Sequence, residues 1–190
     1  SIPFEDVYCI SASHLGYAPI KVCRELFIFE RRGVLVVDRI DSLNSSVDLK
    51  TIWHFAKDCS VEQGDESLMI ENYGTSIRLF SSHFNELNHS IVSGVEGDSP
   101  QGWLTDGIGK RVPIPTLISS ITSERDTSIG WFFSFEKENT IQFTDTQFTL
   151  ITKDKRFNVS FGNWASNFKN PSLYSINLNL KTFPVPPFLR

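Results

Sequence analysis

Histidine is the residue type in this sequence best suited to proton transfer or metal binding, and there are four: His14, His54, His83 and His89. No two are spaced as i and i+4 on a helical pattern, which is the spacing of a zinc-binding helix. His83 and His89 lie in a polar stretch, so exposed loop histidines are expected there, with a metal site as the alternative. His54 stands between two aromatic residues and is expected to be a structural residue of a strand.

Other kinds of catalytic machinery are missing from the sequence. No serine occupies a Gly-x-Ser-x-Gly setting, and the acidic residues are too scattered to reveal a glycosidase pair. The segment 107–110, Gly-Ile-Gly-Lys, lacks the spacing of a phosphate-binding loop and the hydroxyl residue after its lysine. We therefore assign no catalytic residue, no metal ligand and no cofactor.

The three cysteines, Cys9, Cys23 and Cys59, cannot all pair with one another. Their spacing matches neither a zinc site nor a redox pair. Buried small hydrophobic residues are the expected role, and a Cys9–Cys23 disulfide across neighbouring strands is the alternative.

Aromatic side chains are the feature that points to sugar binding, because sugars stack on exposed aromatic faces. Packing in the core is the alternative for each of them. Trp103 is the best placed for exposure, since Gly102 and a polar stretch flank it. The five large candidates are Trp53, Tyr73, Trp103, Trp131 and Trp164.

His14 and Tyr17 are expected in a loop near a functional surface, with Gly16 permitting a sharp turn between them. Histidine changes charge near neutral pH, and tyrosine offers a stacking face and a hydroxyl. The alternative is that Tyr17 packs on the next strand and His14 is solvated. His14, Tyr17 and Trp103 are thus the predicted substrate-binding residues.

The elements that must position these residues are strands. Alternation with a period of two, most regular in the last third of the chain, indicates one buried and one wet face. Tight reversals are expected at Arg31–Gly33, where Gly33 would supply a positive φ, and around Gly74. The proline-rich tail 183–188 cannot be a central strand. Strands are expected at 7–13, 20–30, 34–40, 48–56, 67–72, 76–82, 91–95, 117–122, 128–136, 140–144, 156–161 and 175–180.

Composition supports an all-β protein. The chain has 190 residues, of which 40% are hydrophobic and 21% charged, with 16 Phe and a single Met. We predict one antiparallel β-sandwich domain over residues 1–190, with two packed, supersandwich-like sheets. A net charge of -4 argues against nucleic acid and an anionic membrane as partners. The sequence has no apolar run long enough for a membrane span and no signal peptide, and its abrupt start suggests a piece of a longer protein.

A family resemblance rests on the order of several motifs. The segment 12–17, Ala-Ser-His-Leu-Gly-Tyr, precedes a strand with a central arginine, Arg24. An apolar run ending in Asp38-Arg39 follows, and then Trp-His-Phe at 53–55. With the Gly-Trp segment 102–113 and the strand 117–123, this order resembles the C-terminal β-sandwich of the heparinase II/III-like polysaccharide lyases. Cys23 departs from the pattern, because a histidine is common there.

The resemblance implies a polysaccharide lyase whose helical toroid domain precedes the β-sandwich. Such enzymes cleave uronic-acid polysaccharides by β-elimination, which needs a neutralised carboxylate, a base and an acid. Their catalytic and metal-binding motifs lie in segments that this sequence does not contain. The implied partners are a uronate-containing glycan, bound through the full-length protein, and the upstream helical domain. The implied location is periplasmic or secreted. A stand-alone carbohydrate-binding module and a purely structural sandwich are the alternatives.

Overall fold

The computed structural model describes residues 2–4, 7–41, 45–105, 107–144, 147–160 and 176–179, with the backbone alone for 2–4 and 176–179. The described residues form strands and turns but no helix, which confirms the predicted all-β class. None of them therefore forms a helix that could cross a membrane. The chain divides into two compact units, Ser1–Phe135 and Glu136–Arg190.

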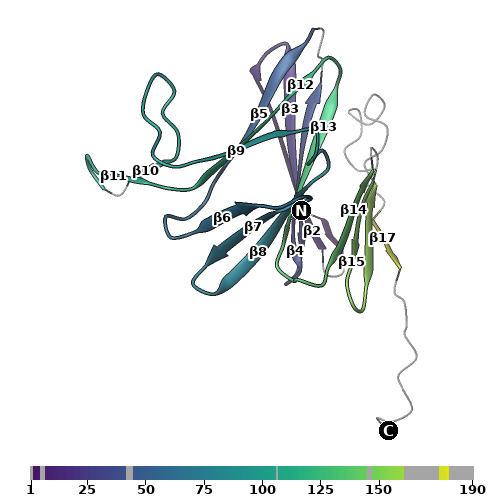
Figure 1. Ribbon diagram of the computed structural model, residues 1–190. Helices are drawn as coiled ribbons and strands as arrows, with labels where there is room; N and C mark the ends of the chain where they lie inside the picture. Colours follow the sequence, from purple (N-terminus) through teal and green to yellow (C-terminus); the bar gives the residue numbers. More distant parts are fainter. Residues whose placement is uncertain are drawn as a thin grey trace. The chain divides into compact units, whose positions relative to one another are not determined.

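The first unit contains two main antiparallel sheets and a small hairpin (Figure 1). The larger sheet has eight strands in the order β1-β2-β3-β4-β13-β8-β7-β6, and a three-stranded sheet has the order β5-β12-β9. The hairpin consists of β10 and β11. The strands are β1 (Ile2–Phe4), β2 (Val7–Tyr17), β3 (Ile20–Phe29), β4 (Gly33–Asp41), β5 (Val47–His54), β6 (Ser60–Gln63), β7 (Leu68–Asn72), β8 (Thr75–Ser81), β9 (Asn88–Val92), β10 (Trp103–Thr105), β11 (Arg111–Pro113), β12 (Thr116–Ser123) and β13 (Thr127–Ser134).

The core of the first unit lies between its two main sheets. Trp131 of β13 is fully buried there, and the ring of Trp53 in β5 meets it edge-on at 6.1 Å. Alternation predicts that Trp53 and Phe55 share one face of their strand, and both pack against this core. The buried members are Val36, Leu68, Ile70, Leu79, Phe84, Leu87, Leu117, Ile129 and Trp131. These contacts make the two sheets a sandwich.

Strand β4 is buried on both sides, which explains its nearly continuous apolar sequence. On the side away from the core, Phe29 and Phe132 meet edge to face at 5.9 Å. The same side carries an ion pair between Glu25 and Arg39, whose side chains are both buried. Each buried charge therefore has an oppositely charged partner in place of solvating water.

The hairpin between β3 and β4 forms where expected, but the role predicted for Gly33 is wrong. The positive φ belongs to Arg31, at 63°. Gly33 is instead the first residue of β4, and a Cβ there would lie 2.3 Å from the backbone oxygen of Phe133. Glycine is required at this position for close approach of the backbones rather than for turn geometry.

The second unit is described as one four-stranded antiparallel sheet in sequence order. Phe148, Leu150, Phe157 and Val159 are buried, and the alternation predicts this for Phe157 and Val159, whereas no strand was expected at 147–151. On the strands' other side, the Thr149 hydroxyl donates a hydrogen bond to Asn158 Oδ1 at 2.9 Å. The strands are β14 (Thr140–Thr144), β15 (Gln147–Ile151), β16 (Arg156–Ser160) and β17 (Ile176–Asn179). The proline-rich tail 183–188, which is predicted not to form a central strand, and Trp164 lie outside the described residues.

Candidate functional site

A cleft of about 790 Å³ opens between the two sheets of the first unit. One wall comes from β2, β3, β4 and β13, and β5 forms the other. Half of the residues that line the cleft are aliphatic, and four are Arg, Lys or Asp, a mixture of apolar and polar groups found in ligand-binding clefts. The lining residues are Ala12, Ser13, His14, Tyr17, Ile20, Val22, Arg24, Asp38, Ile40, Val47, Asp48, Leu49, Lys50, Thr51, Ile52 and Ile129.

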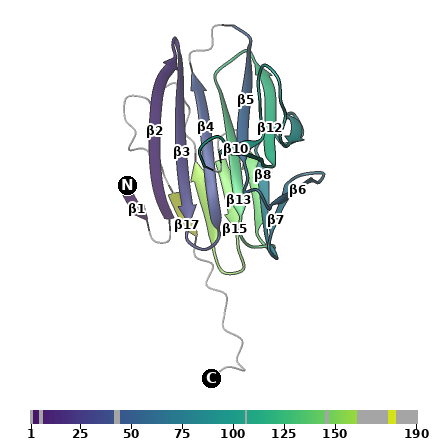
Figure 2. The ribbon, with the colours of Figure 1, turned by 90° about the vertical axis from the view of Figure 1, so that its left-hand side faces the viewer.

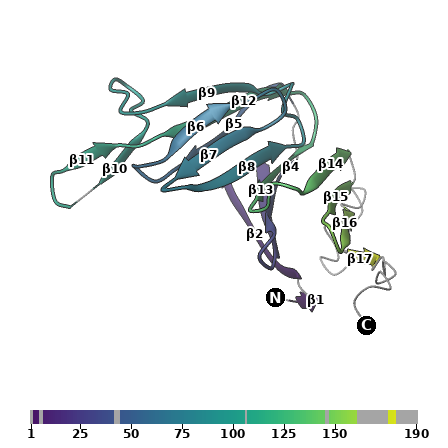
Figure 3. The same cartoon turned by 60° about the horizontal axis from the view of Figure 1, so that its bottom comes forward.

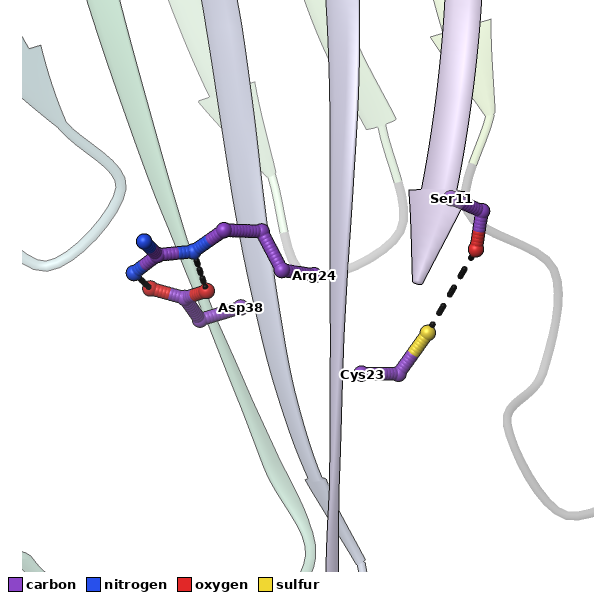
Figure 4. A network of polar contacts seen from close by, with 4 residues as sticks. All are labelled: Ser11, Cys23, Arg24 and Asp38. Carbon is purple, nitrogen blue, oxygen red and sulfur yellow. Dashed lines mark hydrogen bonds and ion pairs between the residues drawn. The ribbon is translucent and has the colours of Figure 1, made fainter. Parts of the chain in front are cut away.

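A paired charge fixes the orientation of a cation in the cleft wall. Arg24 and Asp38 stand directly opposite each other on β3 and β4. Arg24 Nε donates to Asp38 Oδ1 at 2.6 Å and Nη2 donates to Oδ2 at 2.8 Å, a bidentate pair (Figure 4). Hydrogen bonding to the Asp38 carboxylate raises the pKa of Arg24, so the guanidinium stays charged.

The guanidinium is held on a second side by an aromatic ring. Arg24 Cζ lies 5.4 Å from the centre of the Trp53 ring, within cation–π range. The Arg24 side chain nevertheless keeps 48% of its surface exposed, against 10% for Asp38. Arg24 therefore presents a preorganised positive group to the cleft, whereas the charge of Asp38 is satisfied within the wall.

His14 and Tyr17 lie together at the rim of the cleft, although not in the predicted loop. Both belong to β2, which continues to Tyr17, and the reversal follows at residues 18–19. Their ring centres are 5.5 Å apart, and the Gly16 N–H donates to His14 Nδ1 at 3.2 Å. Both side chains are exposed, so their faces are available to a ligand in the cleft.

Trp103, the third predicted residue, does not line the cleft. It lies in the β10–β11 hairpin, away from the cleft walls (Figure 3). Its Nε1 donates to the carbonyl of Val95 at 2.9 Å, and the Arg111 guanidinium covers its ring at 4.7 Å. Glu96 in turn binds Arg111 at 3.1 Å. One face of Trp103 is thus taken by a neighbouring side chain.

Arg24, Asp38 and Lys50 are site residues that the sequence reasoning missed. A signal existed, because Asp38 interrupts the apolar run of β4 and Arg24 occupies the matching position in β3. Counting both strands outward from the turn at residues 30–32 places the two charges opposite each other. The position of Lys50 across the cleft depends on the packing of two sheets, which no local pattern encodes.

The histidine stretch also differs from expectation. His89 is a half-buried residue of β9 rather than an exposed loop residue. Its Nδ1 lies 2.8 Å from Ser119 Oγ, and its Nε2 lies 3.0 Å from the carbonyl oxygen of Phe84. Burial lowers the pKa of His89. Within the described ranges no group of three or more His, Cys, Asp or Glu could hold a metal ion, and all three cysteines are free thiols.

The fold is similar to that of solved polysaccharide lyases. Heparan sulfate lyase HepC from Pedobacter heparinus is 10% identical and matches 94% of this chain with a TM-score of 0.61. The heparinase III product of gene BT4657 is also 10% identical and matches 94% of the chain with a TM-score of 0.58. A further heparinase III is 9% identical over 84% of the chain, with a TM-score of 0.64.

The chain spans only about a quarter of these proteins, covering 27%, 26% and 26% of their respective lengths. The matched part is their C-terminal portion. At such low identity the likeness establishes the fold. No protein-family model and no curated protein sequence matches the chain.

Proposed function

We propose that this chain is the C-terminal β-sandwich of a heparinase II/III-like protein, in which it supports the cleavage of a uronic-acid polysaccharide by β-elimination. The proposal is carried by the cleft, which brings His14 and Tyr17 together with the fixed guanidinium of Arg24. The fold likeness to heparinase III and heparan sulfate lyase structures supports the same assignment.

The groups in the cleft suit glycan binding. Asp38 is neutralised by Arg24, and Asp48 accepts a hydrogen bond from the Thr122 hydroxyl at 2.7 Å. Arg24 Nη1 and the Lys50 ammonium have no hydrogen-bond partner among the described residues, so both can meet acidic groups of a ligand. Aliphatic walls and the ring of Tyr17 would contact the apolar faces of sugar rings.

The chemistry of β-elimination requires more than the cleft provides. A base must take the C5 proton while an acid protonates the leaving oxygen. His14 contributes an imidazole and Tyr17 a phenol to the cleft, but both side chains are solvent-exposed at its rim. We therefore expect the 190-residue chain to bind glycan without cleaving it.

Isothermal titration of the chain with a heparan sulfate oligosaccharide tests this function, with a neutral glucan as the ligand control. Lys50→Gln should weaken binding by about fivefold, the effect of about 1 kcal/mol from an exposed charge. Lys57→Gln, in the turn after β5 and outside the cleft, should leave the affinity unchanged. Tyr17→Ala should also weaken binding through the loss of a stacking face.

Absence of binding at millimolar oligosaccharide would refute the glycan role and favour a purely structural sandwich. Equal affinity for the neutral glucan would contradict the role of Arg24 and Lys50. Formation of unsaturated product, followed by its ultraviolet absorbance, would show that the isolated chain is a complete lyase and that our assignment of a supporting role is wrong.

A further inference from the structure

Among the described residues, strand β2 forms a long edge of the large sheet that β1 covers only at one end. It has 11 residues and contains no Lys, Arg, Asp or Glu. β1 pairs only with Val7–Cys9, leaving Ile10–His14 without a described strand on the side away from β3 (Figure 2). An edge of this kind presents backbone N–H and C=O groups that can pair with another strand.

The other sheet edges of the first unit carry features that discourage such pairing. β6, at the opposite edge of the same sheet, has four residues and includes Glu62. β5 carries Asp48 and Lys50, and β9 is only five residues long. Short edge strands and charged side chains are the usual protection against edge pairing. β2 has neither.

The two sides of β2 define what a neighbouring strand must carry. Ile10, Ala12 and His14 point to the side of Arg24, where Ala12 and His14 line the aliphatic cleft and Ile10 is 51% exposed. Ser11 points to the other side, and its Oγ lies 3.6 Å from Cys23 Sγ. Figure 4 shows the Arg24–Asp38 and Ser11–Cys23 pairs projecting in opposite directions.

We propose that Ile10–His14 binds an extended, uncharged polypeptide strand that alternates aliphatic with hydroxyl residues. The aliphatic row would cover Ile10 and continue the wall of the cleft, and the hydroxyl row would lie beside Ser11 and Ser13. β1 limits the site at Cys9, and the register shift between His14 and Tyr17 limits it at the other end. The site is therefore a five-residue window for strand addition.

A capped peptide in which threonine and valine alternate over seven residues, flanked by glycines, is a suitable probe. In NMR spectra of the isotopically labelled 190-residue chain, it should shift the amide signals of Ile10–His14. It should also slow hydrogen exchange of the edge amides at least tenfold at saturation. Two matched peptides serve as controls: one with the same residues in block order, and one methylated on alternate backbone nitrogens so that it cannot complete the ladder. Both should bind at least tenfold more weakly.

The protein offers a matched pair of variants as well. Ser13→Lys places a charge at the proposed site and should weaken binding at least threefold, whereas Ser60→Lys on the β6 edge should not change it. The proposal is overturned if the alternating peptide causes no shifts in 10–14, or if the N-methylated peptide binds equally well. It is also overturned if sedimentation shows a dimer that Ser13→Lys dissociates, because the occupant would then be a second copy of this chain.

Discussion

The ion pair between Arg24 and Asp38 should contribute measurably to stability, and a double-mutant cycle isolates its contribution. The pair has two charge-assisted hydrogen bonds, at 2.6 and 2.8 Å, and its carboxylate is nearly buried. Opposite charges about 4 Å apart interact by about 4 kcal/mol at the effective dielectric constant of a protein surface. Because Arg24 is 48% exposed, water screens part of this, and we expect a coupling of about 2 kcal/mol.

The assay is urea unfolding of the native chain, Arg24→Met, Asp38→Asn and the double variant, followed by tryptophan fluorescence. Trp53 and Trp131 lie in the core of the same unit and report its unfolding. The stability losses of the two single variants should add up to more than the loss of the double variant. Each single variant leaves one charge without its partner, whereas the double variant removes both charges. A coupling of about 2 kcal/mol corresponds to about 4–8 °C in Tm.

A second cycle on Arg111 and Glu96 provides the control. These side chains also form an ion pair, at 3.1 Å, but they are 53% and 62% exposed. Their coupling should stay below about 0.5 kcal/mol. If the two cycles give equal couplings, or if the Arg24–Asp38 coupling falls below about 0.5 kcal/mol, burial and bidentate geometry do not strengthen this pair as argued.

Two further predictions concern the scaffold. Gly33→Ala should destabilise the chain by about 3 kcal/mol in the same urea assay, because the added Cβ would lie 2.3 Å from a backbone oxygen. Gly64→Ala is the control. Its Cβ would lie 3.2 Å from the nearest atom, so the loss of stability should be less than about 1 kcal/mol. Burial lowers the pKa of His89, so the unfolded chain binds a proton at this residue more tightly than the folded chain does. The contribution of His89 to the free energy of unfolding is therefore complete above the unfolded pKa of about 6.5 and is lost as the pH falls below it. His89→Gln should reduce the loss of stability between about pH 7 and 5. An unchanged pH profile of stability would contradict the lowered pKa of His89.

Much of the architecture could be predicted because half-buried strands produce an alternation of apolar and polar residues in the sequence. The hairpin around Tyr73-Gly74 follows from local turn chemistry, and both residues have positive φ. β6 was not expected, because Ser-Val-Glu-Gln is short and mostly polar. The start of β9 was placed too late for a similar reason: Asn88-His89-Ser90 are polar residues in a strand whose pairing with β12 overrides local preference.

The candidate site was predictable only in part. His14 and Tyr17 were singled out from their types and from Gly16, and the structure places both at the cleft. Their neighbours across it, such as Lys50, come from another sheet, so their proximity depends on how the sheets pack. Trp103 was expected to be exposed because glycine precedes it, but Arg111 lies too far along the chain for a local pattern to show that it covers the ring.

The placement of β13 has a consequence for the order in which the chain can fold. β13 joins the ladder of β1–β4 to that of β6–β8, and it pairs Thr127 with Ile40. Pairing between residues so distant in sequence is slow, because a long loop must close before the contacts form. During synthesis, the buried faces of both ladders stay incomplete until β13 has left the ribosome, and their apolar strands are exposed meanwhile. Truncations that end before Thr127 should therefore yield aggregating chains rather than a smaller folded sheet.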